Sequence, residues 1–142
     1  MNILVLNGPN LNLLGKREPE IYGRETYAQL TERIAAHCQG LGLGVEVRQS
    51  NHEGVLVDWI QEAAGTFEGI VINPAAYTHT SVALLDAVKA VGLPTVEVHL
   101  SDPDAREAFR RVSYVRAACM ATVKGKGFAG YLEAIDLLAG RG

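Results

Sequence analysis

Polar side chains follow two short apolar segments of the sequence, and their types are those used in acid–base chemistry. Glu97 and His99 close one apolar segment, and Asn73 and His79 follow another. In an extended strand Glu97 and His99 point to the same face because they are two residues apart. A carboxylate beside an imidazole favours the protonated ring and fixes its orientation. The pair therefore predicts a proton donor at a strand end, with a purely structural histidine as the alternative.

A long connection after the first apolar segment carries a second group of candidates. It runs from Asn7 to Gly23, whereas strand-to-helix connections usually span about 2–6 residues. Arg17 and Tyr22 lie within it. Long ordered loops with Gly and Pro residues are often lids over a site. A surface loop with a solvated arginine and an anchoring tyrosine is the alternative for this segment alone.

A third group of candidates follows His99. The backbone N–H groups of Leu100 and Ser101 are expected to form an anion pocket at the start of a helix with Pro103 near its first position. Arg106 and Arg110 have the i, i+4 spacing that places two side chains on one face of a helix. They are expected to hold an anionic ligand or to pair with nearby carboxylates.

Capping residues predict two further helix starts. Ser50 and Glu53 have the spacing of a capping box, and His52 between them points either outward or into the site. Thr78 or Thr80 is expected to cap the helix that follows.

The elements that must position these groups alternate along the chain. Short segments rich in Val and Ile predict five buried strands, at Ile3–Leu6, Gly44–Arg48, Gly69–Ile72, Thr95–Val98 and Met120–Val123. Helical periodicity predicts four helices, over 25–38, 54–65, 80–90 and 128–139. This alternation predicts a parallel sheet with helices on both faces. We expect a single α/β domain over 1–142, flavodoxin-like and three-layered, with strand order 2-1-3-4-5 and its ligand beyond the carboxyl ends of the strands.

Composition narrows the classes of function. Hydrophobic residues make up 48% and charged residues 20% of the 142 residues, as in an ordinary soluble globular domain. The net charge of −3 and the lack of a basic stripe argue against nucleic-acid binding. No apolar run is long enough for a membrane span, and the N-terminal segment is interpreted as a strand rather than a signal peptide, so we expect a cytoplasmic protein. Cys38 and Cys119 are too far apart for a metal-binding knuckle and are expected to be buried, with no metal site.

One glycine pattern needs a separate interpretation. Gly125, Gly127 and Gly130 match G-x-G-x-x-G between a strand and a helix. The match falls after the last predicted strand, and no further strand follows to carry a ribose-binding acid. We therefore reject a dinucleotide site and expect a tight turn with close helix packing.

Several of these segments together are similar to one family, the type II 3-dehydroquinate dehydratases. The similarity covers nearly the whole chain. It is carried by Asn7–Leu11, Arg17-Glu18-Pro19, Tyr22-Gly23, Ser50–Gly54, Thr78–Ser81, Glu97-Val98-His99, Arg106-Glu107, Phe109-Arg110 and Ser113-Tyr114.

The resemblance implies dehydration of 3-dehydroquinate to 3-dehydroshikimate through an enolate, without metal or cofactor. The reaction belongs to the shikimate pathway of aromatic amino acid biosynthesis, or to quinate breakdown. By the same resemblance Tyr22 removes a proton next to the ketone and His99 protonates the departing hydroxyl. Arg17 favours the ionised tyrosine, and Asn10 stabilises the enolate through water.

The resemblance also assigns the residues that hold the substrate. Asn73, His79 and Arg110 match residues that bind substrate hydroxyls, and Leu100 and Ser101 match the carboxylate pocket.

The remaining assignments concern support and assembly. Glu97 orients His99, and Arg106 supports the lid. Asp86 reaches the site of a neighbouring subunit in a homododecamer. The segment Arg116–Met120 departs from the Pro- and Gly-rich run of many members, and Asp102-Pro103-Asp104 is more acidic than usual. These departures affect packing and subunit contacts rather than the catalytic residues.

Other classes of function fit less well. A flavin module would carry a Ser/Thr-rich phosphate loop where Asn7–Gly15 stands. A phosphoacceptor domain would need acids where Asn7 and Asn73 stand. A dehydratase that forms a Schiff base would need a larger barrel than 142 residues allow.

Overall fold

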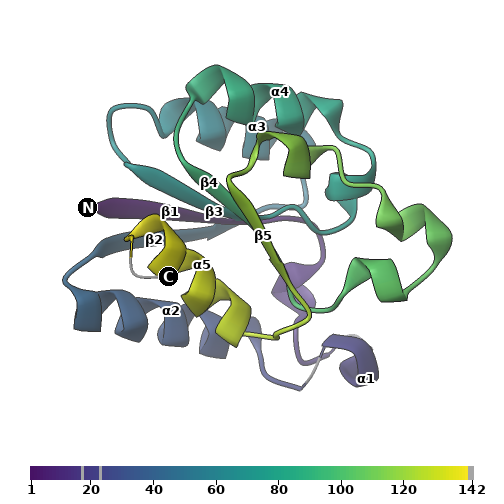
Figure 1. The fold of residues 1–142 in the computed structure, drawn as a ribbon. Coiled ribbons are helices and arrows are strands. Elements are labelled where there is room, and N and C mark those ends of the chain that lie inside the picture. The colour runs from purple at the N-terminus through teal and green to yellow at the C-terminus, as the bar shows by residue number, and fades with distance from the viewer. Residues whose placement is uncertain (17, 23, 141–142) are drawn as a thin grey trace.

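A five-stranded parallel sheet forms the centre of the protein (Figure 1). The computed structural model describes residues 1–16, 18–22 and 24–140, with the backbone alone at Tyr22. The strand order is β2-β1-β3-β4-β5, which confirms the predicted flavodoxin-like order. The strands are β1 Asn2–Asn7, β2 Gly44–Gln49, β3 Gly69–Asn73, β4 Thr95–His99 and β5 Ala121–Lys124.

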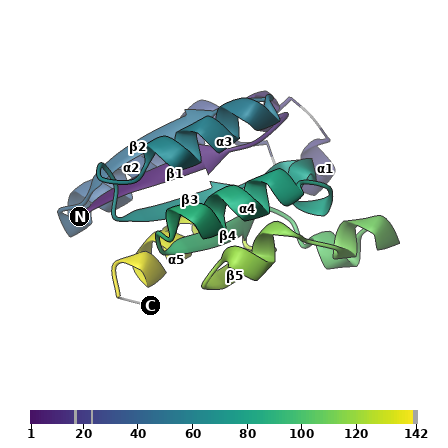
Figure 2. The same cartoon turned by 90° about the horizontal axis from the view of Figure 1, so that it is seen from above.

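The central strands are apolar on both faces because helices cover both sides of the sheet. Every residue of β3 and β4 is buried, including Asn73 and His99 at their ends and Glu97 in the middle of β4. Helices α2 and α5 lie on one face and α3 and α4 on the other, as Figures 1 and 2 show. The helices are α1 Pro19–Tyr22, α2 Tyr27–Leu41, α3 Glu53–Glu62, α4 Val82–Val91 and α5 Ala129–Leu138.

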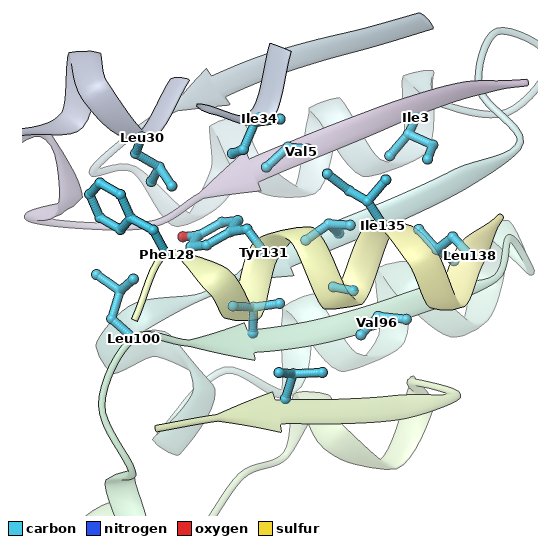
Figure 3. Close-up of a cluster of buried hydrophobic side chains, with 14 of the residues drawn as sticks. Ile3, Val5, Leu30, Ile34, Val96, Leu100, Phe128, Tyr131, Ile135 and Leu138 are labelled. Carbon is cyan, nitrogen blue, oxygen red and sulfur yellow. The ribbon is translucent and has the colours of Figure 1, made fainter. Parts of the chain in front are cut away.

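Two apolar cores result, one on each face of the sheet. Figure 3 shows the core under α2 and α5, where Ile135 and Leu138 pack toward the sheet. Tyr131 of α5 lies in the same core with no exposed surface. Within the described ranges, none of the helices has the length and apolarity that a membrane crossing requires.

Two of the predicted helix caps are wrong. Ser50 does not cap α3, whose N-cap residue is His52. The Ser50 Oγ instead accepts a hydrogen bond from His52 N at 3.0 Å. Neither Thr78 nor Thr80 caps α4. That role belongs to Ser81, whose Oγ accepts a hydrogen bond from Leu84 N at 2.9 Å.

The segment between β4 and β5 is not the helix expected for it. It forms three short 3₁₀ turns, Pro103–Ala105, Ala108–Arg111 and Val115–Ala118. Arg106 sits between the first two turns with an extended backbone, φ −108° and ψ −151°. Arg106 and Arg110 therefore do not share a helical face, and the expected i, i+4 arrangement is wrong.

Both cartoon views place α1 and the segment 103–111 beyond the carboxyl ends of the strands (Figures 1 and 2). The connections after β1, β3 and β4 meet at this same end. Parallel α/β sheets bind their ligands there.

Candidate active site

A pocket opens at the carboxyl ends of β1, β3 and β4, and it holds about 510 Å³ of space, part of it open to solvent. Eight residues predicted from the sequence line it: Asn10, Asn73, His79, His99, Leu100, Ser101, Arg106 and Arg110. Pro9, Leu11, Ala75, Ala76 and Pro103 complete the lining.

His99 forms one wall of the pocket and is supported from behind by Glu97. His99 Nε2 lies 2.8 Å from Glu97 Oε2. The Glu97 side chain is fully buried and His99 is 7% exposed. An ionised carboxylate only accepts hydrogen bonds, so Nε2 carries a hydrogen and donates it. The other ring nitrogen, Nδ1, is then the one left to exchange a proton in the pocket.

Glu97 is surrounded by donors that compensate for its burial. Its Oε2 also accepts hydrogen bonds from the hydroxyls of Thr78 and Ser113, the latter at 3.0 Å. Its Oε1 accepts from Thr122 Oγ1 at 3.3 Å and lies 3.8 Å from Arg116 Nε. Burial alone raises the pKa of Glu97, but its hydrogen bonds and the charge of His99 outweigh burial and lower the pKa. Glu97 therefore stays ionised and fixes the orientation of His99.

Strained backbone borders the pocket at two positions. Asn10 has φ 71° and Ala75 has φ 53°, in the left-handed region that side chains other than glycine rarely adopt. Asn51 Oδ1 accepts a hydrogen bond from Asn10 N at 3.0 Å, and Asn73 Oδ1 accepts one from Ala75 N at 3.0 Å. Side chains thus hold both strained residues in place, as is common at functional sites.

The loops that follow β1 and β3 touch directly. Gly8 N donates to the Asn73 carbonyl oxygen at 2.8 Å. A Cβ atom at Gly8 would lie 2.5 Å from the Pro74 carbonyl oxygen, so only glycine fits this approach. The contact fixes the separation of Asn10 and Asn73 across the floor of the pocket.

His79 and Arg110 also line the pocket. His79 ends the 3₁₀ turn Ala75–His79, and its Nδ1 lies 2.6 Å from the Val112 carbonyl oxygen. A carbonyl can only accept, so Nδ1 donates and Nε2 remains to accept from a ligand hydroxyl. The Arg110 guanidinium is held by the Glu107 carboxylate.

The turn at Gly125–Gly127, before α5, holds the backbone of Leu100 and Ser101 in place. Gly125 N donates to the Ser101 carbonyl oxygen at 3.2 Å, and Gly127 N donates to the Leu100 carbonyl oxygen at 3.0 Å. Both glycines have positive φ, 75° and 58°. The G-x-G-x-x-G pattern thus makes a tight turn, as expected, and that turn also ties down the backbone of the predicted anion pocket.

The segment Asp102-Pro103-Asp104, which is more acidic than usual in the similar family, has a basic partner nearby. Asp104 pairs with Lys124 of β5, which neighbours His99 in the sheet. The hydrogen bond from Lys124 lowers the pKa of Asp104. Asp102 caps the turn Pro103–Ala105, since its Oδ1 accepts a hydrogen bond from Asp104 N at 3.0 Å, and this turn is 3₁₀ and not the expected α-helix.

Besides Glu97, two candidates that the structure describes are absent from the pocket lining. Asp86 is exposed on α4, and His52, exposed at the start of α3, is not part of the lining either. Tyr22 ends α1, but its side chain lies outside the described part of the chain. Arg17 lies outside the described residues altogether.

Several supporting side chains carry no sequence signal for the contacts they make. The sequence indicates Thr78 as a candidate helix cap and Ser113 only as part of a segment similar to the family, yet both bind Glu97. Tyr131 falls in the predicted helix 128–139, which gives no sign of its hydrogen bond with Asn73. A carboxylate at the end of a buried strand signals that donors must exist, but no local pattern identifies them.

The two cysteines are structural. Cys38 is buried as expected, whereas Cys119 is only partly buried. Burial, reinforced by the nearby charge of Glu97, raises the pKa of Cys119 to about 12. Burial also raises the pKa of Cys38. Both thiols therefore stay protonated and unreactive near neutral pH.

Together the fold and the pocket define an α/β protein whose strand ends hold a carboxylate-supported histidine beside amide, imidazole and guanidinium side chains. The family model described as dehydroquinase class II matches residues 1–139, and the chain belongs to this family.

Known proteins of the same kind resemble the chain over nearly its full length. The 3-dehydroquinate dehydratase of Corynebacterium glutamicum strain R is 57% identical over 137 residues, which cover 96% of this chain and 94% of that protein. The 3-dehydroquinate dehydratase 2 of Pseudomonas aeruginosa is 55% identical over 139 residues, covering 98% and 94%. The crystal structure of the type II dehydroquinase from Butyrivibrio crossotus superposes with a TM-score of 0.97 at 48% identity, covering 98% of this chain and 97% of that one.

Proposed function

We propose that the protein dehydrates 3-dehydroquinate to 3-dehydroshikimate in the shikimate pathway. The observation that carries this function is the His99–Glu97 pair in the wall of a pocket, in a chain that belongs to the class II dehydroquinase family. The substrate is a small polyhydroxylated carboxylate with a ketone. Such a ligand requires an anion site, hydroxyl partners and a proton donor, and each has a candidate in this pocket.

The reaction proceeds in two steps. Tyr22 removes a proton from the carbon next to the ketone, and the electron pair moves onto the ketone oxygen to give an enolate. The enolate then collapses, the carbon–oxygen bond of the departing hydroxyl breaks, and His99 gives that hydroxyl a proton so that water leaves. Neither step needs a metal or a cofactor.

A phenolate is the required base because the proton next to a ketone is only weakly acidic. Tyrosine ionises only near pH 10 in water, and the guanidinium of Arg17 favours its ionised form. Asn10 stabilises the enolate through a bound water, and its place in the pocket lining supports this role.

Glu97 acts through His99. The 2.8 Å hydrogen bond from Nε2 and the burial of both side chains support a fixed ring with Nδ1 directed to the departing hydroxyl. The carboxylate also lies next to the ring from which the proton is given away.

Groups on two sides of the pocket hold the substrate. Asn73, His79 and Arg110 bind hydroxyls, and the backbone N–H groups of Leu100 and Ser101 bind the carboxylate. Their common position around one pocket supports this division.

The remaining roles concern the assembly and the lid. We infer that Arg106 supports the lid that carries Arg17 and Tyr22. Asp86 is exposed on α4, which supports a role at a neighbouring subunit's site in a homododecamer. We expect this assembly to act in the cytoplasm.

A spectrophotometric assay tests the activity. Conversion of 3-dehydroquinate creates a conjugated enone, so absorbance in the ultraviolet should rise on adding the purified protein, equally with and without a chelator. No rise, or a rise abolished by the chelator, would overturn the proposed reaction. Borohydride added with substrate should trap no covalent adduct, since a trapped lysine adduct would indicate a Schiff base.

A further inference from the structure

We propose that Tyr131, a core residue of α5, is a positioning residue that orients the Asn73 amide toward the substrate. This inference rests on the proposed function and adds a residue to it. Tyr131 has no exposed surface, so its hydroxyl is separated from the pocket and acts only through its neighbours.

The hydroxyl of Tyr131 joins the ends of two strands. It donates to Asn7 Oδ1 at 2.6 Å and accepts from Asn73 Nδ2 at 2.9 Å. Asn7 and Asn73 are register partners at the carboxyl ends of β1 and β3. Figure 3 shows the Tyr131 oxygen pointing toward the sheet end at which the strand arrowheads lie.

These contacts determine which hydrogen-bonding group of the Asn73 side chain remains for a ligand. Its Oδ1 accepts from Ala75 N at 3.0 Å, which fixes which end of the amide is oxygen. An amide nitrogen has two hydrogens, and Tyr131 takes one of them. Asn73 lines the pocket, so the second hydrogen is left to bind a substrate hydroxyl.

Tyr131 is suited to this task because its hydroxyl both donates and accepts. Burial raises the pKa of Tyr131, so the hydroxyl stays protonated throughout the working range of pH. A phenylalanine of the same shape would fill the core equally well. It would remove the hydroxyl that binds Asn7 Oδ1 and Asn73 Nδ2, and the Asn73 amide could then rotate.

A double-mutant cycle separates positioning from mere stability. Tyr131→Phe should lower kcat/KM for 3-dehydroquinate about tenfold, the effect of one well-aligned hydrogen bond. In an Asn73→Ala background the same change should cost less than twofold, because the amide it orients is gone. A loss of equal size in both backgrounds, or no loss in either, would overturn the inference.

Tyr27→Phe is the matched control. The Tyr27 hydroxyl accepts from Asn7 Nδ2 at 3.4 Å and makes no hydrogen bond with Asn73. Removing it should change kcat/KM less than twofold, whereas a tenfold loss would show that the network as a whole, and not Tyr131, matters. Thermal melting of every variant reports stability separately.

A measurement on the unmutated protein covers the case in which Tyr131→Phe does not fold. In ¹⁵N-labelled protein, added 3-dehydroshikimate should shift one side-chain NH₂ proton of Asn73 far more than the other, which Tyr131 holds. Equal shifts, or no shift, would overturn the inference. Activity of the unmutated protein is measured first. Its absence would defeat the proposed function, whereas an active protein with an additive Tyr131–Asn73 pair would defeat this inference alone.

Discussion

Glu97 Oε2 accepts a hydrogen bond from His99 Nε2 at 2.8 Å, and both residues are buried in β4. The bond determines which ring nitrogen faces the ligand, because Nε2 is engaged and Nδ1 is not. It also places a full negative charge next to the ring that must carry a proton. The acid of the proposed reaction is thus a pair of residues, of which only one lines the pocket.

We predict that Glu97→Gln destabilises the protein in a pH-dependent way. The pKa of Glu97 is lowered in the folded state, so its ionised form adds stability above its ordinary pKa of 4.5, and that stability is lost as the pH falls through the lower folded value. The glutamine variant should be less stable by about 1–3 kcal/mol at pH 7. This difference in the free energy of unfolding between the variant and the unmutated protein should narrow below pH 4.5. Urea denaturation at pH 7, 5 and 4 measures the difference. A difference that does not change with pH would contradict an ionised Glu97 in the folded protein.

Loss of the proposed acid or base should remove most turnover. His99→Gln and Tyr22→Phe should each lower kcat by about 10²–10⁴, the usual contribution of a general acid or base. Melting temperatures should stay close to that of the unmutated protein. His52→Gln is the control, because His52 is exposed and outside the pocket lining. A near-normal kcat in Tyr22→Phe would refute the proposed mechanism.

The thiols should be inert in the folded protein. The pKa of Cys119 is raised to about 12 and that of Cys38 is also raised, so the reactive thiolate is rare at pH 8. Ellman's reagent at pH 8 should titrate neither thiol rapidly in native protein and both in guanidinium chloride. Fast reaction of one native thiol would show an accessible thiolate instead.

Gly8→Ala should loosen the floor of the pocket. The new Cβ would meet the Pro74 carbonyl oxygen at 2.5 Å, and backbone must move to relieve the contact. We expect a loss of about 1–3 kcal/mol in the free energy of unfolding, together with a lower kcat/KM as the two loops separate. Gly40→Ala in α2 is the control, since no atom lies within 4 Å of its added Cβ. That change should leave activity intact and stability equal or up to about 1 kcal/mol higher. Equal effects of the two changes would argue against a specific clash.

The sheet could be predicted because each strand carries its own signal. Short runs such as the one at Ile70–Ile72 are apolar without alternation, as strands buried on both faces must be. Strand order and the position of the site then followed from general rules for parallel sheets. The predicted and observed ends of the strands differ by no more than one residue.

The segment between β4 and β5 could not be predicted in the same way. Its residues favour helix locally, yet distant partners hold it in 3₁₀ turns. Tyr114 N donates to the Thr78 carbonyl oxygen at 2.8 Å, and Ser113 binds the buried Glu97. Such contacts override local propensity and leave no periodic signature. The same holds for Thr78, whose hydroxyl was expected to cap a helix and instead binds Glu97.

The direct contact between the loops at Gly8 and Asn73 has a consequence for binding entropy. Hydrogen bonds and close packing order this half of the pocket during folding, with Ala75 held in its left-handed conformation. A ligand that binds this half of the pocket loses its own conformational entropy, but the protein backbone there loses little more because it is already ordered. Adaptation to a different ligand would therefore have to change side chains above this floor, because the backbone beneath them tolerates little change.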